Sequence, residues 1–157
     1  TRKSSYLVTL LLAAILAVTG LLQVVVTGGH PSGTILLIHM IAAPMFALTL
    51  AAASLLWSDD QQIRESDLPV IWRAFRSWTF EGPEGMEAIA RVLYWKMLVL
   101  ALPLLLSIIL SLFPLFGTEG ENCLIGLHGY SALALVTVAI LHGYICILRS
   151  HSGPQQG

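Results

Sequence analysis

Four long apolar runs limit this 157-residue chain to a small set of folds. They cover residues 6–27, 34–57, 92–116 and 123–148, and each can cross a hydrocarbon layer about 30 Å thick as a helix. Only 11% of the residues are charged, against about 25% in soluble domains. Within hydrocarbon, helices satisfy every backbone N–H and C=O internally. The sequence therefore predicts an all-α integral membrane protein, a four-helix bundle that forms one domain over residues 1–157.

The first run is expected to stay in the protein as a membrane helix. A cleaved signal peptide has an apolar core of about 7–15 residues and an Ala-x-Ala-like cleavage site. Residues 6–27 form a longer run and contain no such site. We therefore count this run as the first of four spans.

The basic residues predict the orientation of the spans. All eight Lys and Arg residues fall on one side of the four runs, whereas the two short turns on the other side contain none. By the positive-inside rule, both termini and the long loop over residues 58–90 are cytoplasmic. The eight residues are Arg2, Lys3, Arg64, Arg73, Arg76, Arg91, Lys96 and Arg149.

The middle of the long loop is predicted to lie on the membrane surface. Residues 67–78 are typical of a helix, with Asp67 as its N-cap. An apolar face flanked by basic side chains favours a helix in the plane of the interface, so membrane lipid is an expected partner. The aromatic and basic residues of this pattern are Trp72, Phe75, Trp78, Arg73 and Arg76.

Two histidines lie near the outer ends of different apolar runs. His39 is in the second run and His128 is in the fourth, at similar depth. Ionisable side chains inside a membrane are costly and usually functional. The pattern predicts that His39 and His128 bind one haem between two helices. The alternative is that each histidine only forms a hydrogen bond that helps the helices pack.

A third intramembrane histidine, His142, follows His128 by 14 residues, about 21 Å along a helix. It leaves the same helix face near the inner end and is a candidate ligand of a second haem. The start of the first run is the natural place for its partner, but Tyr6 stands there. Three arrangements stay open: a single haem, a second haem with an unusual or missing ligand, and a ligand from another subunit.

The cysteines and glycines further define the expected cofactor. Cys123 and Cys146 are 23 residues apart on one predicted helix, about 35 Å, which excludes a disulfide between them. The chain contains no Cys-x-x-Cys-His motif, so any haem is a non-covalent haem b. Gly129 and Gly143 directly follow His128 and His142, and each leaves room for a flat macrocycle beside the backbone.

Several short motifs together resemble a known family. They are residues 19–21 (Thr-Gly-Leu), His39, residues 91–95 (Arg-Val-Leu-Tyr-Trp), and the pair His128 and His142. With these, nearly the whole chain resembles the membrane cytochrome b (gamma) subunits of bacterial formate dehydrogenase and nickel-iron hydrogenase, which are four-helix di-haem cytochromes linked to quinone. The resemblance implies a location in the bacterial inner membrane.

The same resemblance implies roles for individual residues. It pairs His39 with His128 at an outer haem, and His142 with a first-helix position on or near Tyr6 at an inner haem. This sequence departs from the family pattern at that position, which has no histidine. The resemblance also implies that Gly20 forms a notch at a haem edge. Glycine is also common where membrane helices pack closely, which is the alternative for Gly20.

The predicted function is electron transfer between the quinone pool and a redox partner on the outer face, such as a cytochrome c or an iron–sulfur protein. The chain has no nucleotide-binding or iron–sulfur motif. It is therefore expected to be an electron-transfer subunit rather than the primary catalytic one. A quinone pocket at the inner boundary is a further hypothesis, with an aromatic belt as its alternative. The residues concerned are Tyr94, Trp95, Lys96 and Arg91.

Other functions also fit parts of the sequence. One is a stand-alone quinone-linked oxidoreductase that acts on a small oxidant such as superoxide. A second is a haem-free metal or proton transporter that uses the three intramembrane histidines, and a third is a haem-free anchor for a peripheral enzyme. The absence of a basic cluster argues against a nucleic-acid partner.

Overall fold

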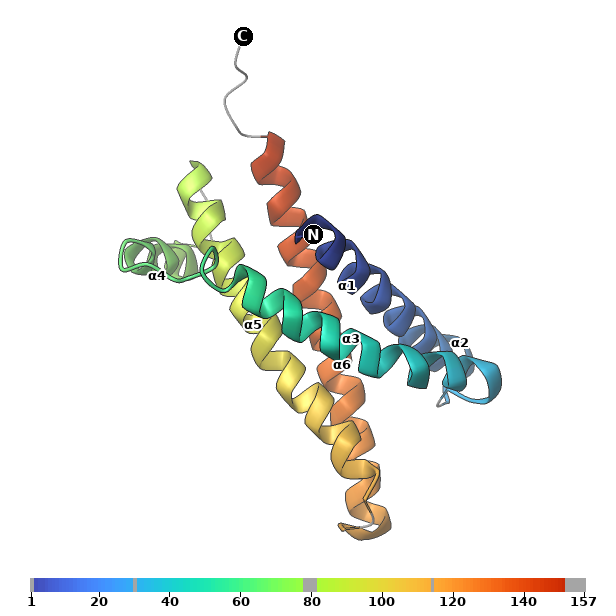
Figure 1. The fold of residues 1–157 in the computed structure, drawn as a ribbon. Helices are drawn as coiled ribbons and strands as arrows, with labels where there is room; N and C mark the ends of the chain where they lie inside the picture. Colours follow the sequence, from blue (N-terminus) through green and yellow to red (C-terminus); the bar gives the residue numbers. More distant parts are fainter. Residues whose placement is uncertain (1, 30, 78–81, 114, 152–157) are drawn as a thin grey trace.

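The chain is helical with short connections, as Figure 1 shows. The computed structural model describes residues 2–29, 31–77, 82–113 and 115–151, and it contains no β-strand in these ranges. The helices, in chain order, are α1 (Arg2–Ala17), the π-helical turn η1 (Val18–Leu22), α2 (Gln23–Thr27), α3 (Gly33–Trp57), α4 (Asp67–Ser77), α5 (Gly82–Ser111) and α6 (Gly117–His151). The all-α prediction is confirmed.

Four helical segments are long and apolar enough to cross a membrane. They are Arg2–Val26, Gly33–Trp57, Glu84–Ser111 and Gly117–His151. Large apolar side chains cover their outer surfaces, and Leu48 and Leu55 of α3 are 73% and 79% exposed. Such surfaces are stable when lipid rather than water surrounds them. The prediction of four apolar helices is therefore confirmed at the level of length and composition.

The long helices form two hairpins that cross one another (Figure 1). The first hairpin packs α1 against α3, and the second packs α5 against α6. The turns of the hairpins point in different directions in Figure 1. The turn η1 contacts α3 of its own hairpin and α6 of the other. The π-helical turn is therefore one place where the two hairpins meet.

Several helix ends differ from the sequence prediction. Helix α5 begins at Gly82 rather than at residue 92, and α6 begins at Gly117 rather than at residue 123. The acidic segment over residues 117–122 was expected to be a turn, but it is helical. The reason is that polar residues continue a helix outside hydrocarbon, and Glu119 in the first turn of α6 favours the helix dipole.

Helix α4 packs against α5 and agrees with the helix expected over residues 67–78. Its side chains Leu68 and Trp72 are 58% and 72% exposed. Trp78, which completes the aromatic pattern seen in the sequence, lies outside the described residues, as does the side chain of Phe75. The described part of α4 thus presents apolar side chains away from α5.

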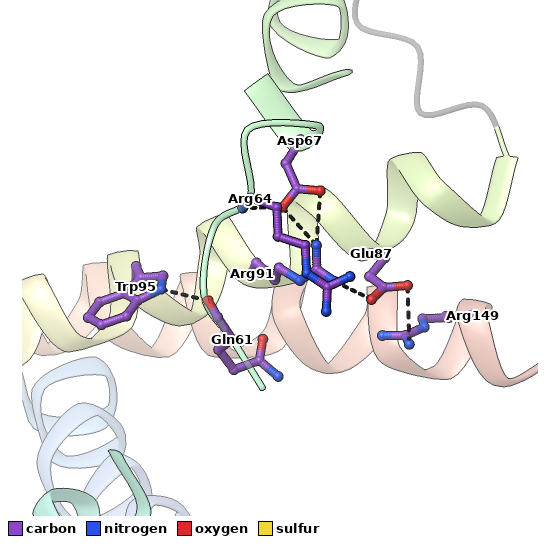
Figure 2. A network of polar contacts seen from close by, with 7 residues as sticks. All are labelled: Gln61, Arg64, Asp67, Glu87, Arg91, Trp95 and Arg149. Carbon is purple, nitrogen blue, oxygen red and sulfur yellow. Dashed lines mark hydrogen bonds and ion pairs between the residues drawn. The ribbon is translucent and has the colours of Figure 1, made fainter. Parts of the chain in front are cut away.

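A network of ion pairs fastens α4 to the α5–α6 hairpin, as Figure 2 shows. Arg91 of α5 donates hydrogen bonds to Asp67 at 2.7 and 2.9 Å and also pairs with Glu87. Glu87 in turn lies 3.5 Å from Arg149 of α6. The Asp67 carboxylate also accepts the backbone N–H of Arg64 at 2.9 Å. The network therefore joins α4, α5 and α6 at one end of the molecule.

Candidate functional site

The π-helical turn places two small residues against a histidine of the next helix. The Oγ1 atom of Thr19 lies 2.9 Å from the Nδ1 atom of His39 in α3. A Cβ atom added to Gly20 would lie 3.1 Å from Cε1 of the same ring. A π-helical turn inserts one extra residue into the helix and is frequent at functional sites. Gly20 thus packs against His39, and its expected role beside a haem stays a prediction.

The hydrogen bonds around Thr19 assign the proton on His39. The Thr19 hydroxyl donates to the carbonyl of Ile15 at 2.7 Å. Its single proton is therefore directed away from His39, and its oxygen accepts the hydrogen bond from Nδ1–H. In this tautomer the Nε2 atom of His39 carries a free lone pair, the form of imidazole that binds a metal.

His128 has the same arrangement on the other hairpin. Its Nδ1 atom lies 2.9 Å from the backbone carbonyl oxygen of Leu104 in α5. A carbonyl oxygen only accepts, so Nδ1 must carry the proton and Nε2 the lone pair. Ser107 is buried beneath this contact and donates to the same carbonyl at 3.1 Å. The α5–α6 hairpin therefore fixes the orientation of the His128 ring.

The structure brings His39 and His128 together from different hairpins. Their ring centroids are 6.3 Å apart, and the ring planes are at 78°. Two imidazoles on opposite sides of one iron have ring centres about 6 Å apart, because a first-row metal lies about 2 Å from an imidazole nitrogen. A direct edge-to-face contact gives similar spacings of about 4.5–7 Å. Spacing alone therefore suits both a haem pair and a packing pair.

The hydrogen bonds of the two rings are compatible with both interpretations. Both Nδ1 atoms point to acceptors within their own hairpins, and in the described part of the chain neither Nε2 atom has a hydrogen-bond partner. Each ring also has the hydrogen bond to a neighbouring helix that the packing interpretation requires. Protein acceptors on one nitrogen and a free lone pair on the other are typical of metal-binding histidines. The residues present therefore also fit haem ligation, which stays a prediction.

His142 lies elsewhere and differs in its partners. Its Nδ1 atom donates to the backbone carbonyl of Ala90 in α5 at 3.1 Å. Its Nε2 atom lies 3.6 Å from the Sγ atom of Cys146, one turn further along α6. Both ring nitrogens are thus engaged, unlike those of His39 and His128. No group of three or more His, Cys, Asp or Glu side chains within the described ranges could hold a metal ion.

The glycines that follow the α6 histidines face open space. A Cβ atom added to Gly129 or to Gly143 would meet nothing within 4 Å. This agrees with room beside the backbone at both positions.

The residues considered for a quinone pocket make contacts within the protein. Tyr94 donates to the Ser54 carbonyl of α3 at 3.1 Å, and Trp95 donates to the Gln61 carbonyl at 2.8 Å (Figure 2). Arg91 is buried in the ion-pair network, whereas Lys96 is exposed. These contacts fasten α5 to α3 and to the connection that follows it. Contacts within the protein therefore account for the positions of Tyr94, Trp95 and Arg91 without a bound ligand.

The sequence analysis did not assign the partners of the histidines. Thr19 is a polar residue in an apolar helix directly before Gly20, and that pattern was a usable signal. The carbonyls of Leu104 and Ala90 are backbone atoms, so only the register between α5 and α6 reveals them. The comparisons of this chain with protein-family models, curated proteins and solved structures found no match.

Proposed function

We propose that this chain is a multi-pass membrane cytochrome b in which His39 and His128 bind one haem. The observation that carries the proposal is the facing pair of imidazoles, each with its Nδ1–H bonded inside the protein and its Nε2 free. When bound, haem supplies a one-electron redox centre. The two hairpins contribute one ligand each, so they also hold each other in register through the site.

The role of such a chain is electron transfer between the quinone pool and a redox partner. The apolar surfaces of the four long helices give access to a lipid-soluble quinone or quinol. We place both termini and α4 on the cytoplasmic side of a bacterial inner membrane, from the distribution of basic residues. The His39–His128 pair then lies toward the outer face, where a cytochrome c or an iron–sulfur protein would exchange electrons with it.

Spectra of the purified chain test this proposal. Reduction should give the split bands of a low-spin b cytochrome, and a pyridine haemochrome assay should find haem. Both His39→Ala and His128→Ala should lose the low-spin signal, because a bis-imidazole centre requires both axial bonds. His151→Ala is the matched control, since His151 is exposed at the end of α6. A colourless wild-type protein would favour a transporter or an anchor instead.

A further inference from the structure

Thr19 differs from the groups that hold the other intramembrane histidines. The Nδ1 atoms of His128 and His142 face backbone carbonyls, those of Leu104 and Ala90. His39 alone of the three is held by a side-chain oxygen. The strength and position of this contact therefore depend on the residue at position 19.

Two hydrogen bonds within its own helix hold the Thr19 hydroxyl in place. The Thr19 hydroxyl donates to the Ile15 carbonyl at 2.7 Å, with a weaker contact to Leu16 at 3.3 Å. These bonds fix the hydroxyl, so its lone pair points toward His39 in the next helix. Gly20 follows in the same turn and leaves space for the ring, because a Cβ atom there would come within 3.1 Å of it. Thr19 and Gly20 thus set the direction and the position of the imidazole.

We propose that Thr19 is the positioning residue of His39, and that its hydroxyl keeps Nε2 of His39 ready for iron and tunes the reduction potential. This inference rests on the proposed function. The Nδ1–H···O hydrogen bond increases the electron density on the imidazole and makes Nε2 a stronger donor. A stronger donor favours ferric over ferrous iron, and the reduction potential is lower as a result.

Thr19→Val is the test, because valine keeps the shape of threonine and removes the acceptor. Without it, the Nδ1–H of His39 is left unpaired in an apolar site, and the ring is free to rotate or to change tautomer. We expect haem affinity to fall by about 10-fold or more. The midpoint potential of the haem that remains should shift to a more positive value. Thr19→Ser restores the hydroxyl and should return both quantities toward wild type.

Thr9→Val is the matched control. Thr9 is in the same helix, and its hydroxyl also donates to a carbonyl one turn back, that of Ser5 at 2.9 Å. The substitution removes the same atoms without touching His39. It should leave haem content and midpoint potential unchanged. An equal effect of Thr9→Val and Thr19→Val would mean that both act only through helix stability, and would overturn the proposal.

A second measurement works on the haem-free protein. Nitrogen-15 NMR of labelled histidine should find His39 protonated on Nδ1 in the wild type, with a shift toward Nε2 protonation in Thr19→Val. An unchanged tautomer together with an unchanged potential would overturn the role of Thr19 while leaving the cytochrome proposal intact. A wild-type protein without haem would overturn both proposals, which keeps the two failures distinguishable.

Discussion

Arg91 and Asp67 form a buried ion pair between α5 and the first residue of α4. The Nη1 atom of Arg91 donates to both carboxylate oxygens of Asp67, at 2.9 and 2.7 Å, and the two side chains are 5% and 11% exposed. Glu87 also pairs with Arg91, and the Asp67 carboxylate also accepts the backbone N–H of Arg64. The pair therefore holds the connection between the two hairpins against α5.

Asp67→Asn should destabilise the protein by about 3 kcal/mol. Removing one partner of a buried ion pair costs about 3–5 kcal/mol, because the other charge is left uncompensated. We expect the lower end of this range, since Glu87 still accepts from Arg91. The free energy of unfolding in detergent measures the change.

Asp60→Asn is the control for this substitution. Asp60 pairs with Arg2 at 2.8 Å, but the two side chains are 53% and 58% exposed. An exposed pair contributes about 1 kcal/mol or less. If Asp60→Asn and Asp67→Asn lowered the free energy of unfolding equally, burial would not make the Arg91–Asp67 pair more stabilising than an exposed pair.

The same carboxylate should make stability depend on pH under acidic conditions. Burial acts to raise the pKa of Asp67, but the Arg64 N–H and the Arg91 charge outweigh it, and the pKa is lowered from its ordinary value of 3.8. The folded protein therefore binds this proton less readily than the unfolded chain. The stabilisation is complete well above pH 3.8 and is lost as the pH falls through the lowered pKa. In unfolding titrations, the gap between wild type and Asp67→Asn should shrink on acidification; a constant gap would contradict the assignment.

Gly20→Ala should disturb the His39 ring without altering its hydrogen bond partner. The added Cβ atom would lie 3.1 Å from Cε1, so the ring must shift by a few tenths of an ångström. We expect altered g-values in the electron paramagnetic resonance spectrum of the ferric haem, and haem affinity about 10-fold lower. Gly126→Ala is the control, because a Cβ atom there meets nothing within 4 Å. Identical electron paramagnetic resonance spectra for wild type and Gly20→Ala would show that Gly20 does not influence the haem site.

The sequence predicts the long helices well because hydrocarbon leaves the backbone few alternatives. Uninterrupted apolar runs marked the continuous segment from α1 to α2, and also α3, within a few residues. The start of α5 at Gly82 was missed, because hydropathy follows the lipid boundary rather than the end of the helix. The first turns of α6, over residues 117–122, were missed for the same reason, because they contain the acidic residues Glu119 and Glu121.

The site was predictable only in part. Equal depth on two apolar helices pointed to His39 and His128, whose rings lie 6.3 Å apart. The π-helical turn that brings Thr19 to His39 has no signal in hydropathy, since it changes the hydrogen-bond pattern and not the composition. The Leu104 carbonyl depends on which turns of α5 and α6 are neighbours, which is a property of packing.

The proposed orientation can be tested with tags. A reporter fused after Gly157 and a tag inserted near Gln61 should be cytoplasmic, because the basic residues lie on that side. A tag in the turn over residues 28–32 should be external. Accessibility to a membrane-impermeant label in intact cells measures each position. Cytoplasmic labelling of that turn would reverse the orientation and place the His39–His128 pair near the inner face.

One haem per chain is the stoichiometry expected of the purified protein. His142 has its Nδ1 bonded to Ala90 and its Nε2 next to Cys146. Tyr6 packs its ring against Trp57, with centroids 6.0 Å apart, at the start of the first hairpin. Tyr6 offers no imidazole nitrogen, the second ligand that a bis-histidine haem at His142 would need. His142→Ala should therefore leave the b spectrum intact, as measured by pyridine haemochrome; loss of one of two haems would show that His142 binds iron.

Tyr6→His tests whether the inner position can accept a haem. If the proposed family resemblance holds, the position on or near residue 6 is where a histidine would face His142. The contact between Cys146 and His142 is a weak sulfur hydrogen bond at 3.6 Å, and a bond to iron would displace it. We therefore expect Tyr6→His to add a second low-spin haem, which raises the haemochrome value from one to two per chain. Tyr6→Phe is the control and should keep the value at one. No spectral change in Tyr6→His would mean that the first helix does not bring residue 6 opposite His142.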